Sequence, residues 1–144
     1  MGFIEDSLER LTSAGYKVTN QRRSLLDVFN HEDDHYKSAK EVQDEVLQET
    51  SGVSLDTIYR NLKILTDLNI IEAQDINNET CYRKHCDPQM GHHHHFICTQ
   101  CGKTIPIEEC PLEEFQNLLP NCQINEHSFR LFGLCEDCLK EKND

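Results

Sequence analysis

Hydrophobic residues recur at helical spacing through most of the first 85 positions of the chain. Apolar side chains three or four positions apart predict four helices, which begin near Phe3, Asn20, Ser38 and Ser54. The two serines suit N-cap positions, and Gly15 is placed to end the first helix. The fourth helix has the clearest apolar stripe, formed by Leu55, Ile58, Leu62, Leu65 and Leu68.

The pattern changes after the fourth helix. Residues 70–74 and 80–83 have strand character and flank the turn-like pair Asn77-Asn78, which predicts a β-hairpin. Helices followed by a hairpin are typical of a winged helix-turn-helix, so residues 1–85 are predicted to bind DNA through the fourth helix. The candidate DNA contacts are Lys17, Arg22, Arg23, Thr57, Tyr59, Arg60 and Lys63. The alternative is a solvated helix face.

The second half of the chain predicts a small α/β domain over residues 92–144, after a Pro/Gly hinge at 86–91. Strands are expected over 92–98, 103–108 and 123–131, with edges available for dimerisation. A helix is expected to start at Pro111 and to turn four apolar residues inward, namely Leu112, Phe115, Leu118 and Leu119. The fold class predicted for the whole chain is therefore α+β.

Two C-x-x-C pairs, Cys98–Cys101 and Cys135–Cys138, lie in this second half. Their spacing is typical of a tetrahedral four-cysteine structural zinc site. With no export signal and no apolar run of membrane-spanning length, the chain is expected in the cytoplasm, where thiols stay reduced. Cys81, Cys110 and Cys122 are interpreted as small apolar residues.

The net charge of −12 argues against a nucleic-acid partner, but a local basic face can form from the basic residues that collect at Lys17, Arg22, Arg23, Arg60 and Lys63. A zinc hydrolase would need an open metal position, and a closed four-thiolate site has none. On this ground neither an enzyme nor a small-molecule substrate is expected. A zinc-ribbon adaptor that binds only protein remains an alternative.

Four consecutive histidines precede the first cysteine pair. Side chains alternate between the faces of a strand, so His93 and His95 are expected to share one face and His92 and His94 the other. Each pair can contribute to a separate metal site.

The segments GYKVTNQRRSLLDVF, SLDTIYRNLKIL, HHHHFICTQCGK and HSFRLFGLCEDC resemble the ferric uptake regulator family of bacterial metal-dependent repressors, in the same order and over nearly the whole chain. The resemblance implies a winged-helix domain, a C-terminal dimerisation domain and a structural zinc site of Cys98, Cys101, Cys135 and Cys138.

The resemblance also bears on the sensed metal. Iron- and peroxide-sensing members use a histidine where this chain has Tyr36, and carboxylates where it has Cys86 and Pro106. These departures favour the zinc uptake regulator branch. Carried over by position, the regulatory zinc ligands are Glu72, Cys86, His93 and His95. A third family site corresponds to His92, His94, Glu113 and His127.

A thiolate, imidazoles and a carboxylate suit zinc independently of the resemblance. The predicted function is a zinc-sensing repressor, with both structural and regulatory Zn²⁺. As a homodimer it would bind palindromic operators of zinc-uptake genes when zinc is sufficient. An iron- or peroxide-responsive regulator of the same family is the alternative.

Overall fold

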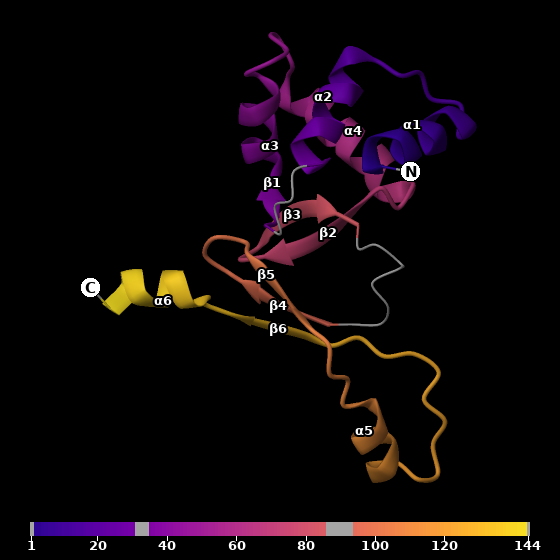
Figure 1. Cartoon of the computed structure of the whole chain (residues 1–144), viewed down its shortest axis with the longest axis vertical. Coiled ribbons are helices and arrows are strands. Elements are labelled where there is room, and N and C mark those ends of the chain that lie inside the picture. The colour runs from indigo at the N-terminus through magenta and orange to yellow at the C-terminus, as the bar shows by residue number, and fades with distance from the viewer. Residues whose placement is uncertain (1, 31–34, 86–93, 144) are drawn as a thin grey trace. The chain divides into compact units, whose positions relative to one another are not determined.

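The computed structural model describes residues 2–30, 35–85 and 94–143 (Figure 1). The chain divides into two compact units, Met1–His85 and Cys86–Asp144. No helix among the described residues is long and apolar enough to cross a membrane. The predicted hinge at 86–91 lies outside the described residues, as do Cys86, His92 and His93.

The first unit has the predicted winged helix-turn-helix architecture. Its helices are α1 (Phe3–Ser13), α2 (Asn20–Asn30), α3 (Ala39–Val46) and α4 (Leu55–Asp67). Its strands are β1 (Lys37–Ser38), β2 (Ile71–Ile76) and β3 (Glu79–Lys84), which form an antiparallel sheet in the order β1-β3-β2. The two-residue strand β1 was not predicted. Four helices and a hairpin therefore form one body.

Local sequence explains where these elements begin and turn. Ser38 and Ser54 cap α3 and α4, since their side chains accept hydrogen bonds from the backbone N–H groups of Glu41 and Thr57, both at 3.2 Å. Asn77 and Asn78 have positive φ angles of 52° and 66°, as a tight two-residue hairpin turn requires. The predicted caps and turn are thus confirmed.

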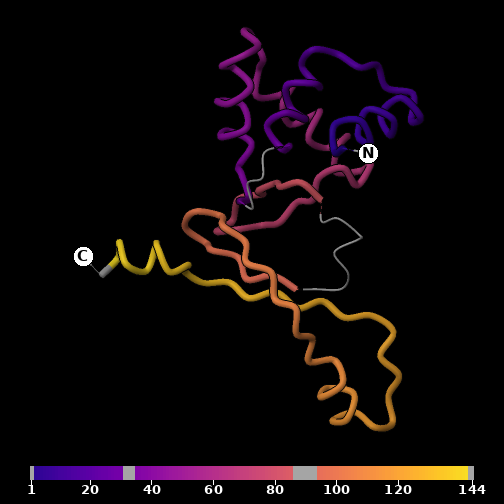
Figure 2. The backbone as a smooth tube through the Cα atoms, in the orientation of Figure 1, coloured from indigo at the N-terminus to yellow at the C-terminus, as the bar shows by residue number. Residues whose placement is uncertain are grey.

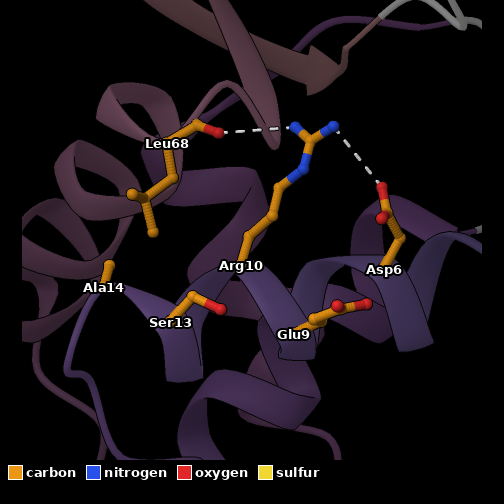
Figure 3. A pocket seen from close by; sticks show the side chains of 6 residues that line it. All are labelled: Asp6, Glu9, Arg10, Ser13, Ala14 and Leu68. Atoms are coloured by element: carbon orange, nitrogen blue, oxygen red, sulfur yellow. Dashed lines mark hydrogen bonds and ion pairs between the residues drawn. The ribbon is translucent and has the colours of Figure 1, made fainter.

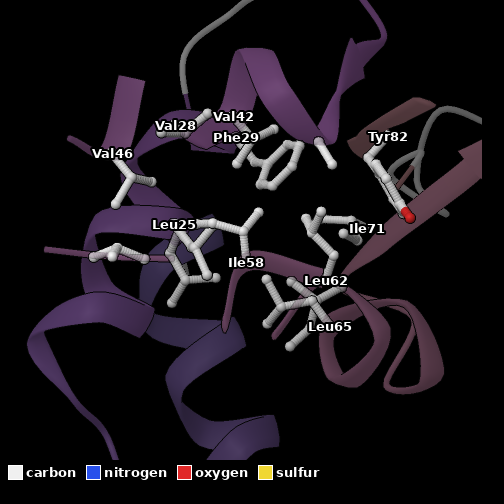
Figure 4. Packing of buried hydrophobic residues seen from close by; sticks show 14 of the residues in the cluster. Leu25, Val28, Phe29, Val42, Val46, Ile58, Leu62, Leu65, Ile71 and Tyr82 are labelled. Atoms are coloured by element: carbon white, nitrogen blue, oxygen red, sulfur yellow. The ribbon is translucent and has the colours of Figure 1, made fainter. Parts of the chain in front are cut away.

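The core of the first unit fixes which face of α4 points outward. Ile58, Leu62 and Leu65 on α4 are at most 1% exposed and pack in one cluster with residues of α2, α3 and the hairpin (Figure 4). Burying each such side chain contributes about 1.5–3 kcal/mol. The opposite face, which carries Tyr59 and Arg60, is exposed. The core therefore presents the predicted recognition face to solvent within this unit.

The second unit contains β4 (His94–Cys98), β5 (Thr104–Ile107), α5 (Leu112–Leu118), β6 (Arg130–Gly133) and α6 (Glu136–Asn143). β4 is the central strand of a three-stranded sheet, with β5 antiparallel on one side and β6 parallel on the other. Figure 2 follows the chain from β5 through α5 and a long loop back to β6. Because β4 is the central strand, the loops that join it to β5 and lead into and out of β6 lie near its two ends.

The structure corrects two expectations for this unit. None of the residues of α5 is buried, and Phe115 and Leu118 are 50% and 73% exposed, so the predicted inward face is wrong for the single chain. A seven-residue helix on an excursion from the sheet has nothing within the described chain to bury it. The predicted strand at 123–131 is also wrong in extent, because β6 covers Arg130–Gly133.

Candidate metal centres and nucleic-acid interface

The four cysteines of the C-x-x-C pairs meet at one end of the β5-β4-β6 sheet. Cys98 ends β4, Cys101 lies in the turn to β5, Cys135 follows β6 and Cys138 lies in α6. All four sulfur atoms lie within 4.8 Å of one another, and the Sγ atoms of Cys101 and Cys135 are 3.8 Å apart. Tetrahedral zinc with bonds of about 2.3 Å would separate its sulfur ligands by about 3.8 Å. We call this group the four-cysteine cluster, and its geometry fits a structural zinc ion.

The thiols of the four-cysteine cluster differ in pKa: burial raises the pKa of Cys101 and of Cys138, whereas the pKa of Cys98 is lowered. Burial alone would raise the pKa of Cys98, but hydrogen bonds from the backbone N–H groups of Cys101, Cys135 and Gln100 lower it to about 6. Cys98, Cys135 and Cys138 are buried and form the centre of a small cluster with Phe96 and Leu134. The four-cysteine cluster is therefore part of the core of the second unit.

A second group of side chains with metal-ligand chemistry lies at the opposite end of the same sheet. The Sγ atom of Cys110 is 3.3 Å from Nε2 of His94 and 3.4 Å from Nε2 of His127. His94 is 6% exposed, and its ring also contacts Phe129 with the centroids 5.6 Å apart. We call these three residues the His-Cys-His cluster. The sequence prediction assigned Cys110 no role, because its position depends on the register of β5 against β4.

The predicted third site is brought together only in part. His94 and His127 belong to the His-Cys-His cluster. Glu113 lies exposed in the first turn of α5 and does not belong to that cluster. His92 lies outside the described residues.

Two of the four predicted regulatory ligands are described, one in each unit. Glu72 on β2 pairs with Arg83 on β3, with 3.0 Å between Oε1 and Nε, and accepts a 3.4 Å hydrogen bond from the hydroxyl of Tyr36. His95 is partly buried on β4, in register with Pro106 of β5 and Arg130 of β6. Cys86 and His93 lie outside the described residues, so the regulatory ligand set stays a prediction.

The predicted DNA contacts on α4 project from the side opposite its buried stripe. Tyr59 is 50% exposed, Arg60 is exposed, and Lys63 forms an exposed 3.0 Å ion pair with Asp67. Thr57 is partly buried in the first turn. These side chains can meet a groove without unpacking the core.

The basic residues that precede α4 in sequence have different surroundings. Arg22 donates to the Oδ1 atom of Asn61 at 3.1 Å and to the carbonyl oxygen of Lys17 at 2.7 Å. Through these bonds Arg22 links the segment before α2 to α4, so its role is to hold α4 in position. Lys17 and Arg23 have exposed side chains.

A depression on the first unit lies between α1 and the C-terminal end of α4. Asp6, Glu9, Arg10, Ser13, Ala14 and Leu68 line it (Figure 3). Arg10 donates to the backbone oxygens of Leu68 and Asn69 at 3.4 and 3.1 Å, at the C-terminal end of α4. A cation at that end interacts favourably with the helix dipole, so the depression marks a structural joint between α1 and α4.

Comparison with known proteins assigns the family. Residues 13–132 match the ferric uptake regulator family model. The chain is 40% identical over 138 residues to a ferric uptake regulation protein of Staphylococcus epidermidis, covering 96% of this chain and 97% of that protein. It also superposes on the ferric uptake regulators of Helicobacter pylori and Vibrio cholerae. The first has a TM-score of 0.72, 25% identity, and coverage of 94% of this chain and 93% of that one. The second has a TM-score of 0.69, 27% identity, and coverage of 90% and 100%. The chain therefore belongs to the ferric uptake regulator family, whose members are metal-responsive transcription regulators and not enzymes.

Proposed function

We propose that this protein is a cytoplasmic, zinc-sensing repressor that binds palindromic operators of zinc-uptake genes as a homodimer when zinc is sufficient. A structural zinc ion in the four-cysteine cluster would hold the second unit together. A regulatory zinc ion on Glu72, Cys86, His93 and His95 would switch DNA binding. Family membership supports the regulator, and the ligand chemistry supports zinc.

The surroundings of His95 are consistent with the choice of zinc. Residues directly opposite one another on paired strands lie on the same face, and here the partner of His95 on β5 is Pro106. Its partner on β6 is Arg130, a cation. Neither neighbour can supply the carboxylate that an oxygen-rich iron or manganese site needs. In the proposed ligand set the anionic ligands are Glu72 and Cys86, and the thiolate of Cys86 would favour zinc.

Glu72 can serve as a ligand only by exchanging partners. Its carboxylate faces Arg83 directly across the β2–β3 pair, and both side chains are more than two-thirds buried. Zinc would have to displace this guanidinium, which makes metal binding by Glu72 a competition with an existing ion pair. The same ion pair would satisfy Glu72 in the metal-free protein.

The exposed apolar surface of the second unit supports a homodimer. Phe115, Leu118, Leu119, Leu131 and Phe132 are each between 44% and 73% exposed. Large apolar side chains that are exposed in a single chain can be buried between subunits. A second copy of this chain is the proposed partner, since two recognition helices match the two half-sites of a palindrome.

The switch would follow from the origin of the ligands. Glu72 belongs to the first unit and His95 to the second. One ion bound to both would restrict their relative orientation and favour the DNA-binding state. By linkage, operator DNA would then tighten zinc binding by the same factor.

An iron- or peroxide-responsive regulator is the second candidate, and the name of the Staphylococcus epidermidis relative, a ferric uptake regulation protein, favours iron. The two candidates differ in which metal activates DNA binding. Operator binding is therefore measured by fluorescence anisotropy during titration with buffered Zn(II), Fe(II) and Mn(II), anaerobically and with the four-cysteine cluster filled. Zinc is expected to activate most strongly. Activation by iron at an equal or lower free concentration would overturn the proposal.

A variant test addresses the ligand set. Cys86→Ser is expected to abolish zinc-induced operator binding while leaving a folded dimer, and Cys122→Ser, an exposed thiol in the second unit, is its matched control. Unchanged zinc activation in the Cys86 variant would refute the regulatory assignment.

A further inference from the structure

We propose that the His-Cys-His cluster is the metal site that the family resemblance associates with His94 and His127, and that Cys110, in place of Glu113, is its anionic ligand. It would bind a borderline-soft divalent cation of the zinc class through one thiolate and two imidazoles. This inference assigns a role to Cys110 and removes Glu113 from the ligand set. It does not depend on which metal the protein senses.

Sheet topology brings the three side chains together. β5 runs antiparallel to β4, so its last residue, Ile107, pairs with His94 at the start of β4. β6 runs parallel to β4, so its first residue, Arg130, lies beside His95. Cys110 follows the β5 pair by three residues, and His127 precedes the β6 pair by three. The fold itself therefore directs both loops to the first residue of the central strand.

The distances between the donor atoms match a coordination sphere. Bonds of about 2.3 Å to sulfur and about 2.0–2.1 Å to nitrogen at a tetrahedral angle place S and N about 3.5 Å apart. The observed separations from Cys110 Sγ are 3.3 Å to His94 and 3.4 Å to His127. All three donor atoms lie within 4.8 Å of one another. An ion can thus be accommodated with small side-chain movements.

Burial and donor type indicate the class of metal. His94 is 6% exposed and packs against Phe129, which fixes its ring, while His127 is exposed and leaves the cluster open on one side. Thiolate and imidazole donors select zinc, copper or cobalt over magnesium, calcium and manganese. With three protein ligands, a tetrahedral ion keeps one further position for another donor.

The His-Cys-His cluster is separate from the four-cysteine cluster. They lie at opposite ends of β4, whose first and last residues are His94 and Cys98. A strand rises about 3.3 Å per residue, which puts these ends about 13 Å apart. No single ion can join them, so the second unit would bind two ions independently.

The test uses cobalt(II) as a spectroscopic probe in the full-length protein, with the four-cysteine cluster already filled with zinc. A Cys86→Ser background removes the proposed regulatory thiolate. A thiolate-to-cobalt charge-transfer band is expected in this background. It should disappear when Cys110→Ser is added and persist when Cys122→Ser is added instead.

Two further variants separate the possible ligand sets. His127→Gln, at an exposed loop position, should weaken cobalt binding about tenfold or more, whereas Glu113→Gln should leave it unchanged. Loss of binding in Glu113→Gln with the band retained in Cys110→Ser would overturn the proposal. The absence of any charge-transfer band would also overturn the proposal, because the three side chains would then be joined by hydrogen bonds alone and would bind no metal. Both readouts are independent of operator binding and of Cys86, so a failure here is distinct from a failure of zinc sensing.

Discussion

Removal of zinc from the four-cysteine cluster is expected to unfold the second unit and leave the first unit folded. Among the described residues of the second unit, Ile97 is the only aliphatic side chain that is fully buried, and it contributes about 1.5–3 kcal/mol. A bound structural zinc contributes about 10–16 kcal/mol, which equals or exceeds the whole stability of a typical domain. A metal ion bound there, and not the apolar core, would therefore decide whether this sheet forms. The first unit has a large core of its own and needs no metal.

Amide hydrogen exchange measured by mass spectrometry separates the two units. Chelator-treated protein, kept reduced, should lose protection in peptides that cover β4, β5 and β6, while peptides from α4 keep theirs. Cys135→Ser should behave in the same way, because Cys135 is 4% exposed within the cluster, and Cys122→Ser should not. Full protection of β4 in protein shown by elemental analysis to contain no zinc would refute this reasoning.

The remaining predictions concern the first unit. Ile58→Ala removes a fully buried side chain and should lower the free energy of unfolding by about 2–5 kcal/mol in urea titrations; a loss below 1 kcal/mol would contradict the packing. Arg10→Ala removes the hydrogen bonds at the end of α4 and should cost about 1 kcal/mol by the same measurement, with no effect counting against the cap. Arg60→Ala should weaken operator binding by about 1–3 kcal/mol and leave stability unchanged, whereas equal affinity would exclude Arg60 from the interface. Burial, followed by carboxylates led by Glu79, raises the pKa of Cys81 from 9.0 to about 11. The unfolded chain therefore loses this proton first, so stability should fall as the pH rises from 9 to 11, and Cys81→Ala should remove that part of the fall.

The sequence predicted the first unit well because its signals are local. Caps at Ser38 and Ser54, the turn at Asn77-Asn78 and the apolar stripe of α4 each depend on neighbours a few positions away. The second unit depends on pairing between distant segments. The apolar residues of α5 were expected inside, but a sequence pattern cannot tell burial within one chain from burial against another. The clustering of Cys110 with His94 could not be predicted without the register of β5.

The C-x-x-C spacing was a strong signal for the four-cysteine cluster, because each pair is local and only the meeting of the two pairs requires the fold. The regulatory ligands are different. Their positions came from resemblance, and the pairing of Glu72 with Arg83 depends on hairpin register that composition does not reveal.

The parallel pairing of β4 with β6 has a consequence for how the protein is made. Each paired residue is 35 positions from its partner, as in His95 with Arg130, so the contact closes a long chain loop with a substantial entropic cost. Cys98 and Cys101 are three positions apart at the turn between β4 and β5, so they can bind an ion before β6 pairs with β4. Cys135 and Cys138 would then complete the coordination of the ion. Metal acquisition would then precede maturation of the sheet. A chain synthesised during severe zinc shortage would be immature, and not merely switched off.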